Sequence, residues 1–412
     1  MSDEAFRQSY LECREILTRR LAEPAPGRIQ LLAGPRQVGK TTLLLEIAGS
    51  LGRQAVYAAA DAPEAALPGF WERLLARAED VAEAEHRAVV LLDEAHLLHD
   101  WAAHLKGIWD RFRRKKTPVH IVATGSSALH LAAGSRESLA GRFERITMTH
   151  WSAASIAEVF AIAPAKAADL VVRMGSYPGA FPLREDVPRW SAYVRDAILE
   201  PAIGRDMLAL GAVRRPALLR QVFGVAASSP AQIVSLQKIQ GQLQDAGALE
   251  TIAHYLALLE EAFLVAQAPK HASTSSRRRA APPKLVPLNN ALVAGMDPEG
   301  LFAGPIEPSR WGSLVENACL AHAWCAGQRV SYWREQPLEV DGVIDGSWGR
   351  WAIEVKTGSF QPRDLAGLLE FVRRERSYRP LVVTTAAGIA TAERASVEAI
   401  SWQEFLLDGP PR

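Results

Sequence analysis

Cysteine is scarce in this chain, with three residues among 412. An odd number leaves at least one thiol outside any set of disulfides, and Cys13, Cys319 and Cys325 lack the spacing of a zinc site. This usage argues against a disulfide scaffold and against a structural zinc centre. It suits a reducing compartment, so we expect a cytoplasmic protein.

Long apolar runs and net charge are also missing. No segment approaches 18 uninterrupted apolar residues, and the first residues, Met1-Ser2-Asp3-Glu4, are acidic where a signal peptide is apolar. We therefore expect no membrane span and no secretion signal. With Lys+Arg 47 against Asp+Glu 46, the net charge is only +1, so any contact with nucleic acid would depend on local basic patches.

The chain has the composition of a globular protein, with 48% hydrophobic and 23% charged residues. A single hydrophobic core rarely serves so long a chain, because cores stop growing at about 250–300 residues. Two or three domains are therefore expected.

The most informative stretch is GPRQVGKT, from Gly34 to Thr41, which fits the phosphate-binding pattern G-x-x-x-x-G-K-[ST]. Residues 28–33 predict a buried strand before it, and residues 42–47 predict a helix after it. In this setting the glycines let backbone N–H groups face phosphate oxygens at the N-terminus of the helix. The candidate nucleotide-binding residues are Gly34, Pro35, Arg36, Gln37, Val38, Gly39, Lys40, Thr41 and Thr42.

We expect ATP in this loop, because no motif for recognising guanine supports GTP. Lys40 would contact the β- and γ-phosphates, and the Thr41 hydroxyl would bind Mg²⁺. A second motif, AVVLLDEAH at residues 88–96, is an apolar run that ends in acidic residues, as a buried parallel strand does at its carboxyl end. Asp93 would hold Mg²⁺ and Glu94 would polarise the attacking water.

Three further residues are candidates for contact with the γ-phosphate. Residues 118–127 predict another strand of the same sheet, and Thr124 or Ser126 at its end could sense the phosphate or orient the water. The alternative is that these hydroxyls cap the next helix. Arg142, which precedes a strand predicted to end at Met148, could neutralise transition-state charge within its own subunit or in a neighbouring one, or could be an ordinary surface arginine.

Four segments, GPRQVGKTTLL, VVLLDEAHLLHDW, VATGSSALHL and ESLAGRFERI, occur in this order and together resemble a prokaryotic family of AAA-like P-loop ATPases with a C-terminal DUF4143 domain. The resemblance implies an ATPase core at 1–150 with a five-stranded parallel sheet, and a helical lid at 151–211. Arg36, Lys40, Thr41, Asp93, Glu94, Gly125-Ser126-Ser127 and Arg142 match its signature positions.

The middle segment, 212–290, predicts a winged helix-turn-helix module, an assignment with which the resemblance agrees. Helices are expected at 215–226, 235–244 and 250–262, and strands at 263–267 and 284–288. The third helix carries three glutamates and neither Lys nor Arg, which argues against base recognition. The stretch 270–284 is basic and free of acid, so it predicts either non-specific contact with DNA phosphates or an ordinary solvated hairpin tip.

The last segment, 291–412, predicts an αβββαβ order that resembles the PD-(D/E)xK nuclease fold. A helix at 311–326 bears Glu316, and a hairpin turning at 345–349 would set Asp341 nearly opposite Glu354, with Lys356 on the same face as Glu354. Two carboxylates and a lysine, with Glu316 approaching from the helix, could bind Mg²⁺ for phosphodiester cleavage.

The alternative is an inert ion-pair network. Val340 stands at the usual proline position of the nuclease motif, and Gly342 stands where a bulky apolar residue is typical.

The expected fold class is α/β: a P-loop NTPase parallel sheet with a helical lid, then a winged-helix module and a small αβββαβ nuclease-like domain. The expected function is an ATP- and Mg²⁺-dependent ATPase whose nucleotide state acts on DNA through the C-terminal half. The alternative is a signalling or scaffold ATPase that binds a protein partner or itself and does not cleave DNA.

Overall fold

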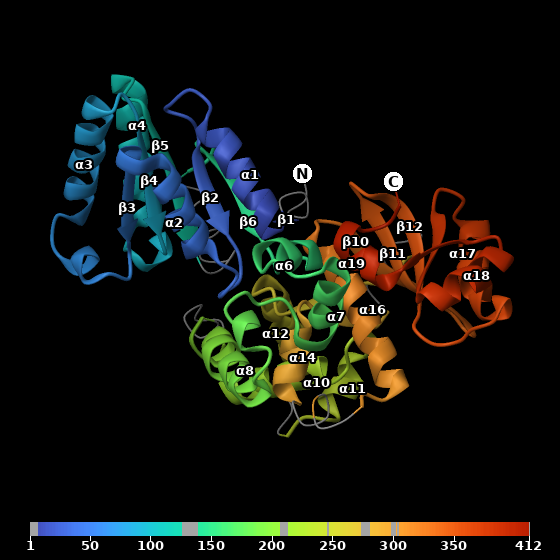
Figure 1. Cartoon of the computed structure of the whole chain (residues 1–412). Coiled ribbons are helices and arrows are strands. Elements are labelled where there is room, and N and C mark those ends of the chain that lie inside the picture. The colour runs from blue at the N-terminus through green and yellow to red at the C-terminus, as the bar shows by residue number, and fades with distance from the viewer. Residues whose placement is uncertain are drawn as a thin grey trace. The chain divides into compact units, whose positions relative to one another are not determined.

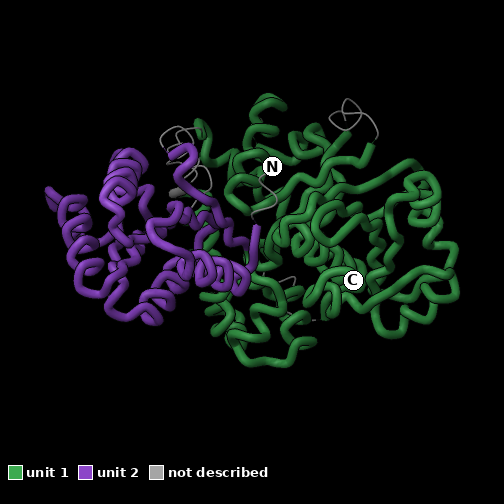
Figure 2. Tube along the Cα trace, turned by 90° about the horizontal axis from the view of Figure 1, so that it is seen from above, with its two compact units in different colours: residues 1–5, 150–412 green, residues 6–149 purple. Residues whose placement is uncertain are grey.

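The computed structural model (Figure 1) describes residues 7–125, 139–206, 213–244, 247–272, 281–297, 302 and 305–411. The chain divides into two compact units (Figure 2). One comprises Phe6–Thr149, and the other comprises His150–Arg412 with the first five residues.

A six-stranded, all-parallel sheet forms the centre of the Phe6–Thr149 unit. Its order is β1-β6-β2-β5-β4-β3. The strands are β1 (Arg7–Gln8), β2 (Ile29–Ala33), β3 (Ala55–Ala59), β4 (Ala88–Asp93), β5 (Val119–Gly125) and β6 (Phe143–Met148). β2 lies inside the sheet, with β6 on one side and β5 on the other, so the segment that follows β2 lies where the strand order reverses. Such a reversal is the usual ligand site of an open α/β sheet.

Helices cover both faces of this sheet (Figure 1), which explains why β2, β4 and β5 are buried along their whole length. α3 (Phe70–Ala84) and α4 (Trp101–Lys115) pack on one face, where Leu74, Ala78 and Ala82 recur at four-residue spacing. On the other face are α1 (Tyr10–Leu21) and α2 (Lys40–Leu51), which contact each other.

The predicted α/β class with a P-loop parallel sheet is confirmed. The expected core had five strands, whereas the sheet has a sixth, β1, which pairs in parallel with Thr147 and Met148. A two-residue strand has no hydrophobic periodicity of its own, so only its partner reveals it.

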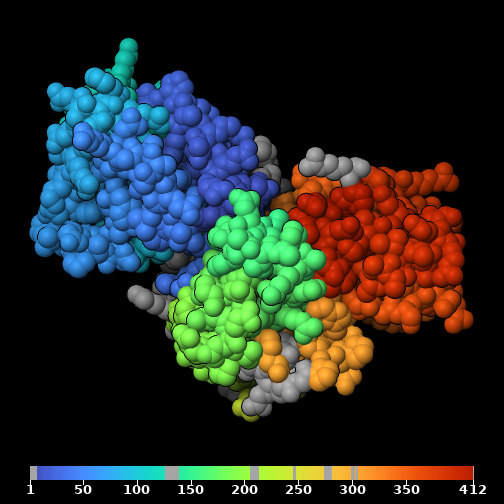
Figure 3. Space-filling view, in the orientation of Figure 1, coloured from blue at the N-terminus to red at the C-terminus, as the bar shows by residue number. Residues whose placement is uncertain are grey.

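The first part of the second unit is helical. It contains α6 (Ala153–Val159), α7 (Pro164–Met174), α8 (Val187–Tyr193) and two π-helical segments, Val194–Leu199 and Pro201–Asp206. α7 packs against α6 and against three later helices: α14 (Asn290–Met296), α16 (Pro308–Cys325) and α19 (Trp402–Asp408). In Figure 3 the green residues of α6 and α7 and the red C-terminal residues form a continuous surface.

Next in the chain, helices and strands alternate as in a winged helix. The order is α10 (Pro216–Ala227), β7 (Gln232–Ile233), α11 (Leu236–Gln240), α12 (Leu249–Glu261), β8 (Val265–Ala268) and β9 (Lys284–Pro287). The three strands form an antiparallel sheet with β9 in the middle.

The C-terminal part contains a five-stranded mixed sheet of order β10-β11-β12-β13-β14. Its strands are β10 (Arg329–Glu335), β11 (Leu338–Gly346), β12 (Gly349–Lys356), β13 (Arg379–Thr384) and β14 (Glu398–Ser401). The first three are antiparallel and the last two extend β12 in parallel. α17 (Ala366–Arg374) and α18 (Ala386–Arg394) contact this sheet, as do α16 and α19. The expected αβββαβ order is present, with α18, β14 and α19 added after it.

No helix in the described part of the chain is both long enough and apolar enough to cross a membrane.

Candidate functional site

The loop between β2 and α2 closes around the side chain of Lys40, the first residue of α2. Lys40 is 5% exposed, and its Nζ donates hydrogen bonds to the carbonyl oxygens of Gly34 at 3.1 Å and Pro35 at 2.7 Å. These acceptors are neutral main-chain oxygens, so a phosphate oxygen that replaced them would form a stronger, charge-assisted bond.

Two glycines give this loop its shape. A Cβ at Gly34 would collide with the carbonyl oxygen of Met148 on the neighbouring strand β6. Gly39, directly before α2, has φ 91°, a left-handed conformation that favours glycine. The glycines of the motif are therefore required by close approach and by backbone conformation.

Beside the loop, the ends of β4 and β5 bring three predicted residues together. The hydroxyl of Thr124 donates to Asp93 Oδ1, and the backbone N–H of Glu94 donates to Asp93 Oδ1 at 3.1 Å and to Thr124 Oγ1 at 3.0 Å. Asp93 and Thr124 are buried, whereas the carboxylate of Glu94 is partly exposed, with His96 Nδ1 3.2 Å from Glu94 Oε2. Thr124 therefore fixes both the metal-binding candidate and the main chain of the candidate base.

The sequence did not point to Tyr57, whose hydroxyl lies 3.3 Å from Asp93 Oδ2 and donates to it. Burial, and after it the charge of Asp93, raise the pKa of Tyr57 to about 12, so the hydroxyl keeps its proton. A signal was available: Tyr57 lies in β3, which pairs with β4 along the strand that ends in Asp93.

The residues at this edge of the sheet suit a magnesium ion, because Mg²⁺ prefers carboxylate and hydroxyl oxygens. Asp93 supplies a carboxylate whose oxygens are held by Thr124 and Tyr57. Thr41, in the first turn of α2, offers an exposed hydroxyl. Ser126 lies outside the described residues.

Arg142 and the phosphate loop lie at opposite ends of the strands of the sheet. Its carbonyl oxygen accepts a bond from the N–H of Ile29, the first residue of β2, whereas the loop follows the last residue of that strand. Four residue steps along a strand span roughly 13 Å. The Arg142 side chain binds Asp110 at 2.9 Å and lies 5.7 Å from the ring centre of Trp109. The Arg142 side chain therefore lies away from the phosphate loop of its own chain, which leaves two of the alternatives: action on a neighbouring subunit, or an ordinary surface arginine.

In the second unit, the structure brings the four residues of the predicted nuclease-like cluster together. The register pairs Gly342 with Ile353, which sets Asp341 beside Glu354 on the adjacent strand. Asp341 Oδ2 accepts from the N–H of Val355 at 2.8 Å, and Lys356 Nζ is 2.7 Å from Glu354 Oε1.

The two departures from the nuclease motif fit this packing. A side chain at Gly342 would collide with Ile353 and Leu320, and Val340 is fully buried in the core beneath α17.

A fifth member of this cluster, Lys284, is a correction to the predicted basic wing. Its side chain is 2% exposed and points into the molecule, where Nζ lies 2.7 Å from Glu316 Oε1. It therefore cannot contribute to a DNA-binding surface. Of the predicted wing at 270–284, residues 273–280, which include Arg277, Arg278 and Arg279, lie outside the described residues.

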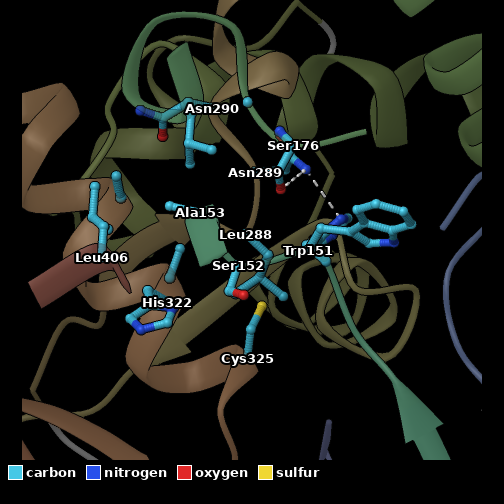
Figure 4. Close-up of a pocket in the computed structure, with 15 residues that line it drawn as sticks. Trp151, Ser152, Ala153, Ser176, Leu288, Asn289, Asn290, His322, Cys325 and Leu406 are labelled. Atoms are coloured by element: carbon cyan, nitrogen blue, oxygen red, sulfur yellow. Dashed lines mark hydrogen bonds between the residues drawn. The ribbon is translucent and has the colours of Figure 1, made fainter. Parts of the chain in front are cut away.

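A cavity of about 30 Å³ at the start of the second unit is lined by apolar residues and by several polar side chains (Figure 4). Asn289 donates to His150 and to the hydroxyl of Ser176, both at 3.2 Å. Burial lowers the pKa of His150 and of His322, which also lines the cavity, to about 4, so both rings are neutral. A space of this size holds water and no metabolite, so the cavity belongs to the interior and is not a ligand site.

Comparison with known proteins assigns domains to three parts of the chain. Residues 26–157 match an AAA domain, residues 166–300 match a domain of unknown function (DUF8612), and residues 311–405 match a second such domain (DUF4143). No curated protein matches the chain.

Similar solved structures include a RuvB variant from Thermotoga maritima, with 19% identity, a TM-score of 0.34, and coverage of 63% of this chain and 90% of that one. Another is DnaA from Aquifex aeolicus bound to AMPPCP, with 13% identity, a TM-score of 0.33, and coverage of 63% and 89%.

The position of Thr124 leads to a first prediction. Thr124→Val removes the hydroxyl that binds Asp93 and receives the Glu94 N–H, while side-chain volume is nearly unchanged. We expect the single-turnover rate of ATP hydrolysis to fall roughly 10- to 100-fold, because small displacements of reacting groups cost factors of this size. ATP affinity, measured by calorimetry, should change less than about threefold. Thr124→Ser, which keeps the hydroxyl, is the control, and an undiminished rate in Thr124→Val would remove the positioning role.

Proposed function

We propose that this chain, which carries an AAA-type ATPase domain and a C-terminal DUF4143 domain, binds and hydrolyses ATP at the loop 34–42 and couples the nucleotide state to a DNA-contacting C-terminal half. One observation carries the ATPase part. A buried lysine sits inside a closed phosphate loop, next to strand ends that present Asp93, Glu94 and Thr124 as one hydrogen-bonded group.

In this proposal the loop binds the triphosphate by exchange of hydrogen bonds. The Lys40 ammonium gives up the carbonyls of Gly34 and Pro35 and takes phosphate oxygens in their place. The N-terminus of α2 adds backbone N–H groups to the same phosphates. Asp93 and the Thr41 hydroxyl would hold the Mg²⁺ ion, which neutralises phosphate charge when it is bound.

Glu94 is the proposed general base. Its φ of 49° turns the chain directly after β4, and its main chain is held by Asp93 and Thr124, so its carboxylate projects beyond the end of the strand. From there it would accept a proton as the water attacks the γ-phosphate.

Arg142 would act on the nucleotide of a neighbouring subunit. Its ion pair with Asp110 keeps the guanidinium at the edge of the sheet remote from its own loop. An arginine supplied in this way stabilises the transferred phosphoryl group. The active form is then a self-associated one, and the site is incomplete in a single chain.

The C-terminal half is proposed to contact DNA through Lys270 and Arg277 to Arg279, the basic residues of the predicted wing other than the buried Lys284. A second function, binding of a protein partner without cleavage, is favoured by α12. This helix, at the position of a recognition helix, exposes Glu250 and Glu261 and contains neither Lys nor Arg. Glutamate repels phosphate, so base recognition by α12 is not part of the proposal.

The ATPase proposal is tested with two substitutions that separate binding from chemistry. Lys40→Ala should abolish ATP binding in calorimetry, whereas Glu94→Gln should retain binding and reduce the turnover number by about 10²- to 10⁴-fold, the usual contribution of a general base. Lys116→Ala, an exposed lysine after α4, is the control and should behave as wild type. Unchanged ATP affinity in Lys40→Ala would refute the assigned binding loop.

The proposal for Arg142 is tested by mixing two inactive proteins. Arg142→Ala retains a complete phosphate loop, and Lys40→Ala retains the arginine. Their mixture should regain roughly a quarter of wild-type activity if subunits pair at random across head-to-tail interfaces. Arg113→Ala, an exposed arginine on α4, should lose nothing by itself. A mixture as inactive as its components would rule out action between subunits.

DNA contact by the wing is tested by its salt dependence. Replacing Lys270, Arg277, Arg278 and Arg279 with alanine should lower the slope of log affinity against log salt by about 3–4, because each phosphate contact contributes about 0.9. The control is Arg113→Ala/Arg114→Ala/Lys115→Ala/Lys116→Ala, which removes four exposed positive charges from the ATPase unit and so matches the change in net charge. An unchanged slope, or no binding of duplex DNA by the wild type, would favour the protein-partner function.

A further inference from the structure

The carboxylate cluster of the C-terminal sheet already contains a cation. Lys284, the first residue of β9, is 1% exposed, and its ammonium lies 2.7 Å from Glu316 Oε1, 3.6 Å from Glu339 Oε1 and 3.8 Å from Asp341 Oδ1. It also donates to the main-chain oxygen of Asp341 at 3.0 Å. Three acidic side chains and one carbonyl thus surround a single buried ammonium.

The charge balance shows how strongly this ammonium is held. Burial opposes the charge of Lys284, but the carboxylates of Glu316, Asp341 and Glu339 outweigh it, so the pKa of Lys284 is raised. The remaining acid, Glu354, is paired with Lys356. Burial raises the pKa of both Glu316 and Glu354, and the nearby charge of Asp341 adds to the effect. A cation close to these carboxylates therefore stabilises their ionised form, and the Lys284 ammonium is that cation.

The nuclease-like fold implies a divalent metal ion at this position, and the residues do not fit one. Within the described residues, no three carboxylate, histidine or cysteine side chains are arranged so that they could hold a metal ion. The distance of 2.7 Å from Lys284 to Glu316 is that of a charge-assisted N–H···O bond, whereas Mg²⁺ binds oxygen at about 2.0–2.1 Å. A metal ion bound by Glu316 and Asp341 would lie against the ammonium, and repulsion between the two cations would oppose it.

We infer that the Lys284 ammonium is the resident cation of this cluster, held in the place of a divalent metal ion, and that the C-terminal domain does not cleave nucleic acid while Lys284 is there. The inference concerns the C-terminal half of the proposed function and does not depend on ATP hydrolysis. It assigns the cluster a different role, because Lys284 comes from the winged-helix sheet whereas Glu316 comes from α16 and Asp341 from β11. The ion pairs join these parts of the chain.

Mn²⁺ binding to the full-length, nucleotide-free protein tests this inference. Asp93→Asn serves as the background, so that the proposed metal ligand of the ATPase domain does not contribute. With Lys284 present we expect no tightly bound Mn²⁺ by electron paramagnetic resonance. Lys284→Met removes the charge and leaves an unbranched side chain only one atom shorter, and it should increase Mn²⁺ affinity at least tenfold. The added change Glu316→Gln should abolish this gain.

Lys356→Met is the matched control, because it removes the other lysine of the cluster and leaves Lys284 in place, so no gain in affinity is expected. Circular dichroism establishes that each variant is folded. A folded Lys284→Met protein that gains no Mn²⁺ would overturn the inference. If that variant does not fold, the background protein still decides. Mn²⁺ bound to it and lost in Glu316→Gln would overturn the inference, as would Mn²⁺-dependent nicking of plasmid DNA that Glu354→Ala abolishes.

Discussion

The need to balance the charge of a buried lysine shapes both functional regions of this chain. An ammonium group taken out of water costs several kcal/mol unless other groups replace its solvation. Lys40 and Lys284 are 5% and 1% exposed, and they meet this need in different ways. Lys40 is solvated by two neutral carbonyl oxygens, whereas Lys284 faces the carboxylates of three residues.

Because of this difference, the partners of Lys40 can be exchanged for a ligand, whereas the partners of Lys284 are fixed parts of the protein. The hydrogen bonds from Lys40 to carbonyl oxygens can be exchanged for bonds to a phosphate oxygen, which are stronger because both partners are charged. The Lys284 ammonium is already attracted by carboxylates of the protein itself. Removal of one partner from such a pair costs about 3–5 kcal/mol, because it leaves an unbalanced buried charge. The same residue type thus marks a binding loop in one unit and a fixed junction in the other.

Much of the ATPase core could be predicted from the sequence because strands such as β4 are mainly apolar runs followed by distinctive residues. The register that sets Asp341 beside Glu354 followed from counting back from the turn at 345–349, since side chains alternate along a strand. The sequence could also have predicted the location of Arg142. Arg142 directly precedes β6, and the starts of parallel strands lie at the end of the sheet opposite the phosphate loop. Lys284 was assigned to the wing because arginines lie close to it in sequence. The contrary signal was the apolar run Leu285-Val286-Pro287-Leu288 directly after it, which predicts a strand buried on both faces.

The sequence does not predict the hydrogen bonds that buried asparagine amides form between distant segments. The amide of Asn290 donates to carbonyl oxygens of Val172 and Leu314, and Asn317 donates to Pro287 and Asn290, so α7, α14, α16 and the end of β9 share one buried network. Each such bond contributes only about 0.5–1.5 kcal/mol, and the small cavity beside Asn289 leaves space for side chains to shift. A single bond of this amide network is therefore weaker than an ion pair of Lys284, for which the loss of one partner costs about 3–5 kcal/mol.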